Sequence, residues 1–265
     1  MKINSIVFSG GGMKGVSFLG VLKRLQEQNL LKDIKDYYGT SIGGLICLCM
    51  ILNFTFEELT EFFHLHLKSI KPCMNISNLI KEYGADNGDK LQLLISRILN
   101  FKLFSIKTTF KELHLKTEKQ LNVFAVDLKD QNVVHFSHLN TPDFLVLDAV
   151  KASMSLPIIF KPVLNRYIDG ALLCNFPKDF SQNEASTFCF NITSEPQEIS
   201  SLFNYITNIF SCIINYQLVQ RKRNCERNVF NLDVNIDSLD FNLSKETILE
   251  IINIGYEIKI DLEFF

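Results

Sequence analysis

The sequence predicts an α/β fold in three layers, with helices on both faces of a mainly parallel central sheet. Short apolar segments that suit buried strands alternate with segments of helical periodicity, the pattern of a layered α/β protein. Glycine-rich turns follow the first two of these strands, and each turn leads into a helix. The strands are expected at residues 4–9, 36–39, 121–127, 132–137, 167–169 and 187–192.

The spacing of apolar residues predicts the first helices. Residues 42–52 should form an almost wholly apolar helix that is buried on all sides. Another helix is expected at residues 90–99. The helix after the first strand is predicted by apolar residues at helical spacing, Val16, Leu19, Leu22 and Leu25.

Two more helices are predicted from the residues that would begin them. Thr55 with Glu58 forms a capping box, in which each side chain bonds to the other residue's main-chain N–H. Thr141 followed by Pro142 combines a cap with a proline at the first helical position, and that helix should end near Ser153.

The length and composition favour one globular domain. The chain has 265 residues, of which 47% are hydrophobic and 21% charged, so a large core can form without disulfides or metals. With no linker or repeat, we expect a single domain over residues 1–265, with its motifs in 5–180 and a strand and helices in 181–265. The formal net charge of -2 and the lack of a basic stripe argue against a nucleic-acid partner.

The chain shows no targeting or membrane-spanning signal. The apolar stretch near the N-terminus is too short for a secretory signal peptide, and no run of about 20 apolar residues suggests a transmembrane helix. The seven cysteines lack metal-site spacing and are expected to be free thiols, with Cys47 and Cys49 buried. We therefore expect a cytoplasmic protein without a metal, which could contact membranes peripherally.

The pentapeptide Gly39-Thr40-Ser41-Ile42-Gly43 matches the pattern G-x-S-x-G. It follows a short strand and opens a buried helix, which is the setting of a nucleophile elbow. Gly39 and Gly43 would allow the tight turn and close packing, and the helix N-terminus would favour negative charge near Ser41. A glycine-rich turn with a serine cap has the same pattern, so the pentapeptide alone leaves both interpretations open.

A second glycine-rich turn, Gly-Gly-Gly-Met-Lys-Gly at residues 10–15, lies between the first strand and the first helix. Its main-chain N–H groups could approach an anion closely. The turn also matches the dinucleotide-binding pattern G-x-G-x-x-G, and Asp33 and Asp36 lie near the expected position of a ribose-binding acid. Lys14 opposes the helix dipole unless an anion compensates it. An oxyanion loop and a pyrophosphate loop both remain possible from this motif.

Asp169-Gly170-Ala171 follows the strand at 167–169 and, taken alone, most resembles a turn. A nucleophilic serine, however, needs a base. No histidine follows a late strand convincingly, and His64 and His66 are two positions apart on one helix, so they do not share a face. Asp169 is therefore the best candidate base. The histidines interpreted as structural are His64, His66, His114, His135 and His138.

Taken together, the motifs resemble those of the patatin-like phospholipase family over about the first 180 residues. The family's nucleophile would be Ser41, and its catalytic aspartate, in the motif D-G-[GA], would be Asp169 with Gly170 and Ala171. Its oxyanion-hole motif G-G-G-x-[KR]-G matches Gly10, Gly11, Gly12, Lys14 and Gly15.

Two further segments carry the same resemblance. Residues 152–157, Ala-Ser-Met-Ser-Leu-Pro, together with Phe160 are similar to the family's A-S-x-x-x-P-x-x-F segment. Asn175 and Pro177 are similar to the N-x-P that often follows the aspartate. Four motifs in the family's order are more specific than any one of them.

The resemblance implies a patatin-like fold and a Ser–Asp dyad that needs neither a metal nor an organic cofactor. Asp169 would take the proton of Ser41, which would attack a fatty-acyl ester, first of phospholipids or lysophospholipids at a membrane or micelle surface. The ordinary pKa of an aspartate is about 3.9, so this role predicts apolar surroundings that raise it. An acyltransferase or thioesterase, and a catalytically idle lipid-binding protein, remain alternatives.

A possible membrane contact lies in the C-terminal third of the chain. Arg221, Lys222 and Arg223 follow an apolar helical stripe, and this combination can bind anionic lipid surfaces. A helix packed on the core with a solvated basic end has the same pattern. The stripe consists of Leu202, Tyr205, Ile206, Ile209, Phe210, Ile213 and Ile214.

Overall fold

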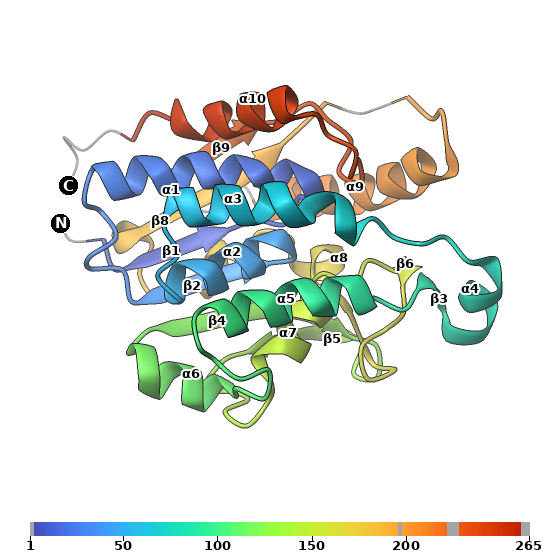
Figure 1. Cartoon of the computed structure of the whole chain (residues 1–265), viewed down its shortest axis with the longest axis horizontal. Helices are drawn as coiled ribbons and strands as arrows, with labels where there is room; N and C mark the ends of the chain where they lie inside the picture. The colour runs from blue at the N-terminus through green and yellow to red at the C-terminus, as the bar shows by residue number, and fades with distance from the viewer. Residues whose placement is uncertain (1–2, 196–197, 222–227, 261–265) are drawn as a thin grey trace.

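A seven-stranded, mainly parallel sheet forms the centre of the molecule (Figure 1), as predicted. The computed structural model describes residues 3–195, 198–221 and 228–260. The strand order is β5-β4-β2-β1-β8-β9, with β7 also paired to β4. Only β5 and β7 run antiparallel to their neighbour. The strands are β1 (Ser5–Phe8), β2 (Asp36–Thr40), β4 (Gln120–Asp127), β5 (Asn132–Phe136), β7 (Tyr167–Asp169), β8 (Thr187–Thr193) and β9 (Val229–Asp233).

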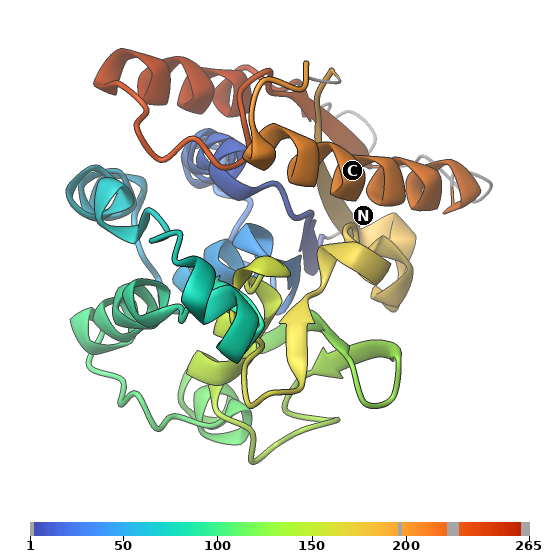
Figure 2. The ribbon, with the colours of Figure 1, turned by 90° about the vertical axis from the view of Figure 1, so that its right-hand side faces the viewer.

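Helices cover both faces of this sheet (Figure 2), and the side chains of each strand alternate between the two layers. Phe8 packs in the large core on one face, whereas its neighbour Val7 packs in a smaller cluster on the other. The thicker layer contains α1 (Ser17–Glu27), α2 (Ile42–Ile51), α3 (Phe56–His66), α5 (Asp89–Phe101), α7 (Val146–Ser153) and α10 (Lys245–Tyr256). The thinner layer contains α8 (Ala171–Cys174) and η3 (Lys178–Phe180).

The pairing of β4 brings the ends of two distant segments together. Strand β2 pairs with one edge of β4 as far as Thr40, which lies opposite Phe124. The antiparallel strand β7 continues along the same edge, and its Asp169 pairs with the next residue, Ala125. The chain therefore leaves β2 at Ser41 directly beside the end of β7 at Asp169.

A smaller sheet and several further helices complete the described chain. The second sheet pairs β3 (Gly84–Asp86) with β6 (Ile158–Phe160) in parallel. The remaining elements are η1 (Gly12–Val16), η2 (Leu67–Ile70), α4 (Ile76–Glu82), α6 (Phe110–Thr117), η4 (Glu184–Ser186) and α9 (Leu202–Arg221).

The predicted helix start at Thr141 was wrong, because α7 begins at Val146. The hydroxyl of Thr141 instead bonds back to the main chain of Ser137, which closes a turn. Leu145 then forms a β-bridge with Thr109, so the chain is extended just before the helix. The capping box of Thr55 and Glu58 is confirmed at the start of α3.

Free thiols were expected, and the six cysteines that the structure describes are free, with Cys47 and Cys49 buried on α2. Within the described parts of the chain, no helix combines the length and the apolar character needed to cross a membrane.

Candidate active site

Ser41 lies in the sharp turn between β2 and α2, at the first position before the helix. Its φ of 54° and ψ of -126° lie in a region that residues other than glycine rarely adopt. This geometry fits a nucleophile elbow, one of the two interpretations that the pentapeptide left open. Ser41 is 8% exposed, and it lines a pocket at the C-terminal edge of the sheet.

Glycines make this turn possible by letting main chains approach one another closely. A Cβ atom on Gly39 would lie 2.4 Å from the main chain of Gly43. A Cβ atom on Gly43 would in turn lie 2.6 Å from the carbonyl oxygens of Phe8 and Ser9. Both contacts are too short for any larger residue, so α2 packs on the ends of β2 and β1 only because both positions are glycine.

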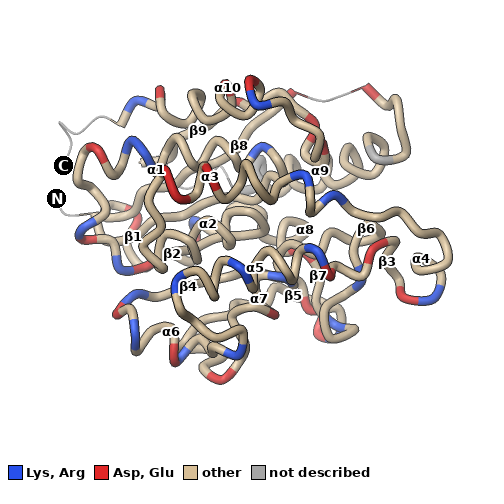
Figure 3. The backbone as a smooth tube through the Cα atoms, in the orientation of Figure 1, with Lys and Arg blue, Asp and Glu red and all other residues tan. Residues whose placement is uncertain are grey.

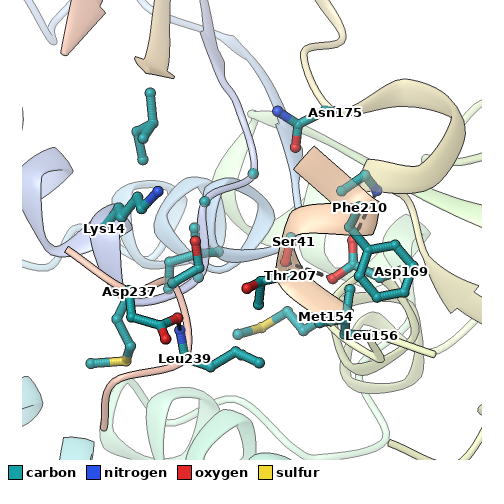
Figure 4. A pocket seen from close by; sticks show the side chains of 18 of the residues that line it. Lys14, Ser41, Met154, Leu156, Asp169, Asn175, Thr207, Phe210, Asp237 and Leu239 are labelled. Carbon is teal, nitrogen blue, oxygen red and sulfur yellow. Dashed lines mark hydrogen bonds between the residues drawn. The ribbon is translucent and has the colours of Figure 1, made fainter. Parts of the chain in front are cut away.

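Asp169 lies directly beside Ser41. The Oγ of Ser41 donates a hydrogen bond of 2.8 Å to Oδ2 of Asp169 (Figure 4). The other carboxylate oxygen, Oδ1, accepts a hydrogen bond of 2.8 Å from the main-chain N–H of Ala171. The carboxylate is thus held by both oxygens, and one of them faces the serine.

Burial raises the pKa of Asp169 from its ordinary value to about 7, although hydrogen bonds from Ala171 and Ser41 oppose this shift. Asp169 is only 3% exposed, and Ile168 and Ala171 beside it are also buried. These neighbours are the kind of apolar surroundings that the role of a base predicted for Asp169. A pKa near 7 suits a group that must accept and return a proton near neutral pH.

The glycine-rich turn at residues 10–15 passes over Ser41 and is held at three of its N–H groups. The N–H of Gly10 bonds to the carbonyl of Asn175, that of Met13 to Ser238, and that of Lys14 to Gly11. Among the described residues, the N–H groups of Gly11 and Gly12 have no acceptor. Both glycines line the same pocket as Ser41, so two free donors are available there.

Residues 237–239 hold the glycine-rich turn in place, and the sequence analysis did not identify them. Gly12 has a φ of +57°, and a Cβ atom there would lie 2.2 Å from the carbonyl oxygen of Ser238. Asp237 accepts hydrogen bonds from the main-chain N–H of Leu239 and from the side chain of Asn204 on α9. No motif marked these residues, because only the tertiary fold brings them to the turn.

Lys14 is a buried cation at the edge of the pocket. Its Nζ donates a hydrogen bond of 2.6 Å to Oγ of Ser194. Burial lowers the pKa of Lys14, and the carboxylates of Asp237 and Asp233 oppose this shift. The sequence analysis expected an anion to compensate Lys14 at the start of the helix. Asp237 and Asp233, from the C-terminal part of the chain, supply this negative charge.

Ser153 supports the turn at Ser41 through two hydrogen bonds. Its Oγ accepts a hydrogen bond of 2.7 Å from the main-chain N–H of Ser41 and donates one of 2.6 Å to the carbonyl of Phe124. Ser153 belongs to the segment at residues 152–157 that resembled a family motif, but the sequence did not indicate its contact with Ser41.

The pocket over Ser41 and Asp169 has a volume of about 420 Å³, within the range of roughly 300–1,000 Å³ typical of small-molecule sites. Most of its wall is apolar and comes from α2, α3, η2, α5 and α9. The larger apolar side chains that line it include Leu45, Phe63, Leu67, Leu94, Phe210 and Ile214. Such a wall suits a hydrocarbon chain, although α9 also contributes polar side chains to it, among them Ser211 and Asn215.

The histidines and the acidic residues considered as alternatives lie elsewhere. Of the described residues that line the pocket, none is a histidine. His114 and His138 stack on each other, and His135 bonds to Asn122. Asp36 begins β2, so it lies at the opposite edge of the sheet from the glycine-rich turn. A dinucleotide would bind at the carboxyl ends of the strands. Asp36 lies at the amino end of β2, so it is not placed to bind the ribose of a dinucleotide.

Among the described residues, no three histidine, cysteine or acidic side chains are grouped in a way that could hold a metal ion. In a comparison with models of protein families, the family described as patatin-like phospholipase matches residues 6–179. The chain belongs to the patatin-like phospholipase family. It is therefore a lipid hydrolase of the esterase type.

Relatives of this patatin-like phospholipase are found in viruses and bacteria. The uncharacterized protein R571 of Acanthamoeba polyphaga mimivirus is 26% identical, over 91% of this chain and 87% of the relative. A probable lipid hydrolase, 463L, of Invertebrate iridescent virus 6 is 32% identical, over 67% of this chain and 62% of its own length. A cGAMP-activated phospholipase of Escherichia coli is 25% identical, over 82% of this chain and 64% of its own length.

Solved structures support the patatin-like fold. VipD from Legionella pneumophila superimposes with a TM-score of 0.62 at 15% identity, covering 97% of this chain and 66% of VipD. The type III effector ExoU superimposes with a TM-score of 0.53 at 16% identity, covering 97% of this chain and 52% of ExoU. At these identities, the likeness concerns the fold alone.

Proposed function

We propose that this patatin-like phospholipase cleaves fatty-acyl ester bonds of phospholipids or lysophospholipids through an acyl-enzyme on Ser41, with Asp169 as the base. The observation that carries the proposal is the 2.8 Å hydrogen bond from Ser41 Oγ to Asp169 Oδ2 at the floor of an apolar pocket. The relatives described as a lipid hydrolase and a phospholipase support this choice of substrate.

The first half of the reaction forms the acyl-enzyme. Ser41 Oγ attacks the ester carbonyl carbon while its proton passes to Asp169 Oδ2. The carbonyl oxygen becomes an oxyanion, which the free N–H groups of Gly11 and Gly12 can stabilise, with the charge of Lys14 nearby. The ester C–O bond then breaks, and Asp169 returns the proton to the leaving alkoxide.

The second half releases the fatty acid. Water attacks the acyl carbon and gives its proton to Asp169. The bond to Ser41 Oγ breaks, the proton returns to Ser41, and the carboxylic acid leaves. No step needs a metal or an organic cofactor. An alcohol or thiol in place of water would make the enzyme an acyltransferase, and the same acyl-enzyme serves both reactions.

A panel of lipids assayed for released fatty acid tests this function. It contains phosphatidylcholine, lysophosphatidylcholine, a triglyceride and an acyl thioester, each with and without an alcohol acceptor. We expect hydrolysis of the first two, lowered about 10³-fold or more in Ser41→Ala. Equal hydrolysis by this variant would overturn the proposal, and an acylated alcohol as the main product would favour the transferase.

A further inference from the structure

Helix α9 forms one border of the Ser41 pocket and is unusual in its composition. From Leu202 to Gln220 it has no charged residue, and Figure 3 shows it as a stretch without charge beside helices that carry both signs. A surface helix of a globular protein normally has a charged or polar outer face. The outer face of α9 therefore needs a physical explanation.

The predicted apolar stripe of α9 divides into two rows. Ile206 is buried, and Phe210 and Ile214 line the pocket. The outer row is exposed to solvent, from 37% for Ile213 to 67% for Tyr216. It consists of Leu202, Tyr205, Ile209, Ile213 and Tyr216. The stripe is thus not fully packed on the core; one row faces the pocket and the other faces outward.

Helix α4 provides a second exposed apolar surface at the same end of the molecule. None of its side chains is buried, and Ile76, Ile80 and the following Tyr83 are between 71% and 76% exposed. The preceding η2 lines the pocket through Leu67 and Ile70. Figures 1 and 2 both place α4 and α9 at the end toward which β1 and β2 run, where Ser41 lies.

We propose that the outer row of α9 and the exposed side chains of α4 form one lipid-docking surface that places the border of the Ser41 pocket against an anionic membrane. This inference rests on the proposed function and deepens it. Apolar side chains that flank a pocket for acyl chains would shield a lipid from water as it leaves the bilayer. Isolated exposed apolar residues need no explanation, but two helices that both expose apolar side chains at the pocket end of the molecule do.

The charges near α4 favour an anionic lipid surface over a neutral one. Between residues 67 and 85, Lys68, Lys71 and Lys81 are exposed, and the acidic residue of this segment, Glu82, is paired with Lys161. Lysines close to an anionic bilayer each strengthen binding, and salt weakens the effect. The basic run that was predicted to assist, Arg221 to Arg223, lies outside the described side chains.

Co-sedimentation with vesicles tests the surface. The full chain is mixed with phosphatidylcholine vesicles that contain or lack phosphatidylserine. The test variants are Ile209→Ser/Ile213→Ser and Ile76→Ser/Ile80→Ser. The matched control is Leu115→Ser/Leu139→Ser, because Leu115 on α6 and Leu139 are comparably exposed and α6 lies at the opposite end of the molecule (Figure 1). Circular dichroism confirms that each variant is folded.

We expect each test variant to lose at least about tenfold in vesicle binding, with a parallel loss in hydrolysis of vesicle lipids. Hydrolysis of a soluble short-chain ester should not change, since none of the four isoleucines lines the pocket. The control should match the wild type. Replacing Lys68, Lys71 and Lys81 with glutamate should remove the preference for phosphatidylserine.

Two results would overturn the docking surface. One is wild-type binding by both test variants, and the other is a dimer of the wild type that the same substitutions dissociate, which light scattering would detect. Failure of the proposed function is a separate outcome. In that case the wild type would bind vesicles without releasing fatty acid, whereas Ser41→Ala should still bind vesicles if only the docking proposal is correct.

Discussion

The main-chain N–H of Ser41 donates a hydrogen bond of 2.7 Å to Oγ of Ser153, which itself donates to the carbonyl of Phe124. Three segments therefore meet beneath the proposed nucleophile: the turn after β2, the end of α7 and strand β4. The contact holds Ser41 in a conformation with positive φ, which costs about 1–3 kcal/mol for a residue other than glycine.

Substitution of Ser153 should weaken both the fold and catalysis. Ser153→Ala leaves the buried N–H of Ser41 unpaired, which should lower the free energy of unfolding by about 1–3 kcal/mol and reduce kcat. Ser155→Ala is the matched control, because its hydroxyl bonds to the carbonyl of Lys151 and not to the turn. Urea unfolding and ester hydrolysis measure the two effects. Wild-type kcat in Ser153→Ala would refute a positioning role.

The pH dependence of activity should follow the ionisation of Asp169. Only the carboxylate can take the proton of Ser41, and burial raises its pKa to about 7. The kcat/KM for a soluble ester should therefore increase with pH and level off above a midpoint near 7. A pH–rate profile measures this midpoint. If kcat/KM already levelled off near the ordinary pKa of aspartate, burial would not determine the pKa of the base.

The same shift predicts how Asp169 affects stability. The folded protein holds this proton more tightly than the unfolded chain, so between the ordinary pKa of 3.8 and about 7 the folded state binds more protons. The free energy of unfolding should thus fall as pH rises through this window. Asp169→Asn should lose that part of the slope and most of the activity. Denaturant unfolding at several pH values provides the test, and equal slopes would contradict it.

Adjacent glycines at the start of α2 should differ in their tolerance of a side chain. The Cβ of Gly43→Ala would lie 2.6 Å from two carbonyl oxygens of β1 and the residue after it, whereas that of Gly44→Ala would come no closer than 3.2 Å to the main chain of Gly39. We expect Gly43→Ala to cost about 1–3 kcal/mol of stability and to disturb Ser41. Gly44→Ala should be close to neutral, because alanine favours the helix. Thermal unfolding compares the pair, and similar Tm values would count against this packing.

The local features of the site could be predicted from the sequence because each depends on neighbouring residues. The turn at Ser41 needs the adjacent Gly39 and Gly43, and Asp169 follows its own strand directly. Long-range contacts had no such signal. Ser238 meets the glycine-rich turn, and Asn204 bonds to the neighbouring Asp237, only through the tertiary fold. Thr141 misled the helix prediction, because a threonine can cap a turn as well as a helix.

Mass spectrometry of the acyl-enzyme tests the central claim most directly. The wild-type protein is mixed briefly with a lysophospholipid, quenched in acid and digested, and the peptides are searched for a fatty-acyl group. We predict an acyl adduct on the peptide that contains Ser41, and none on that peptide in Ser41→Ala. An adduct on another residue, or lipid hydrolysis that persists in Ser41→Ala, would contradict the account.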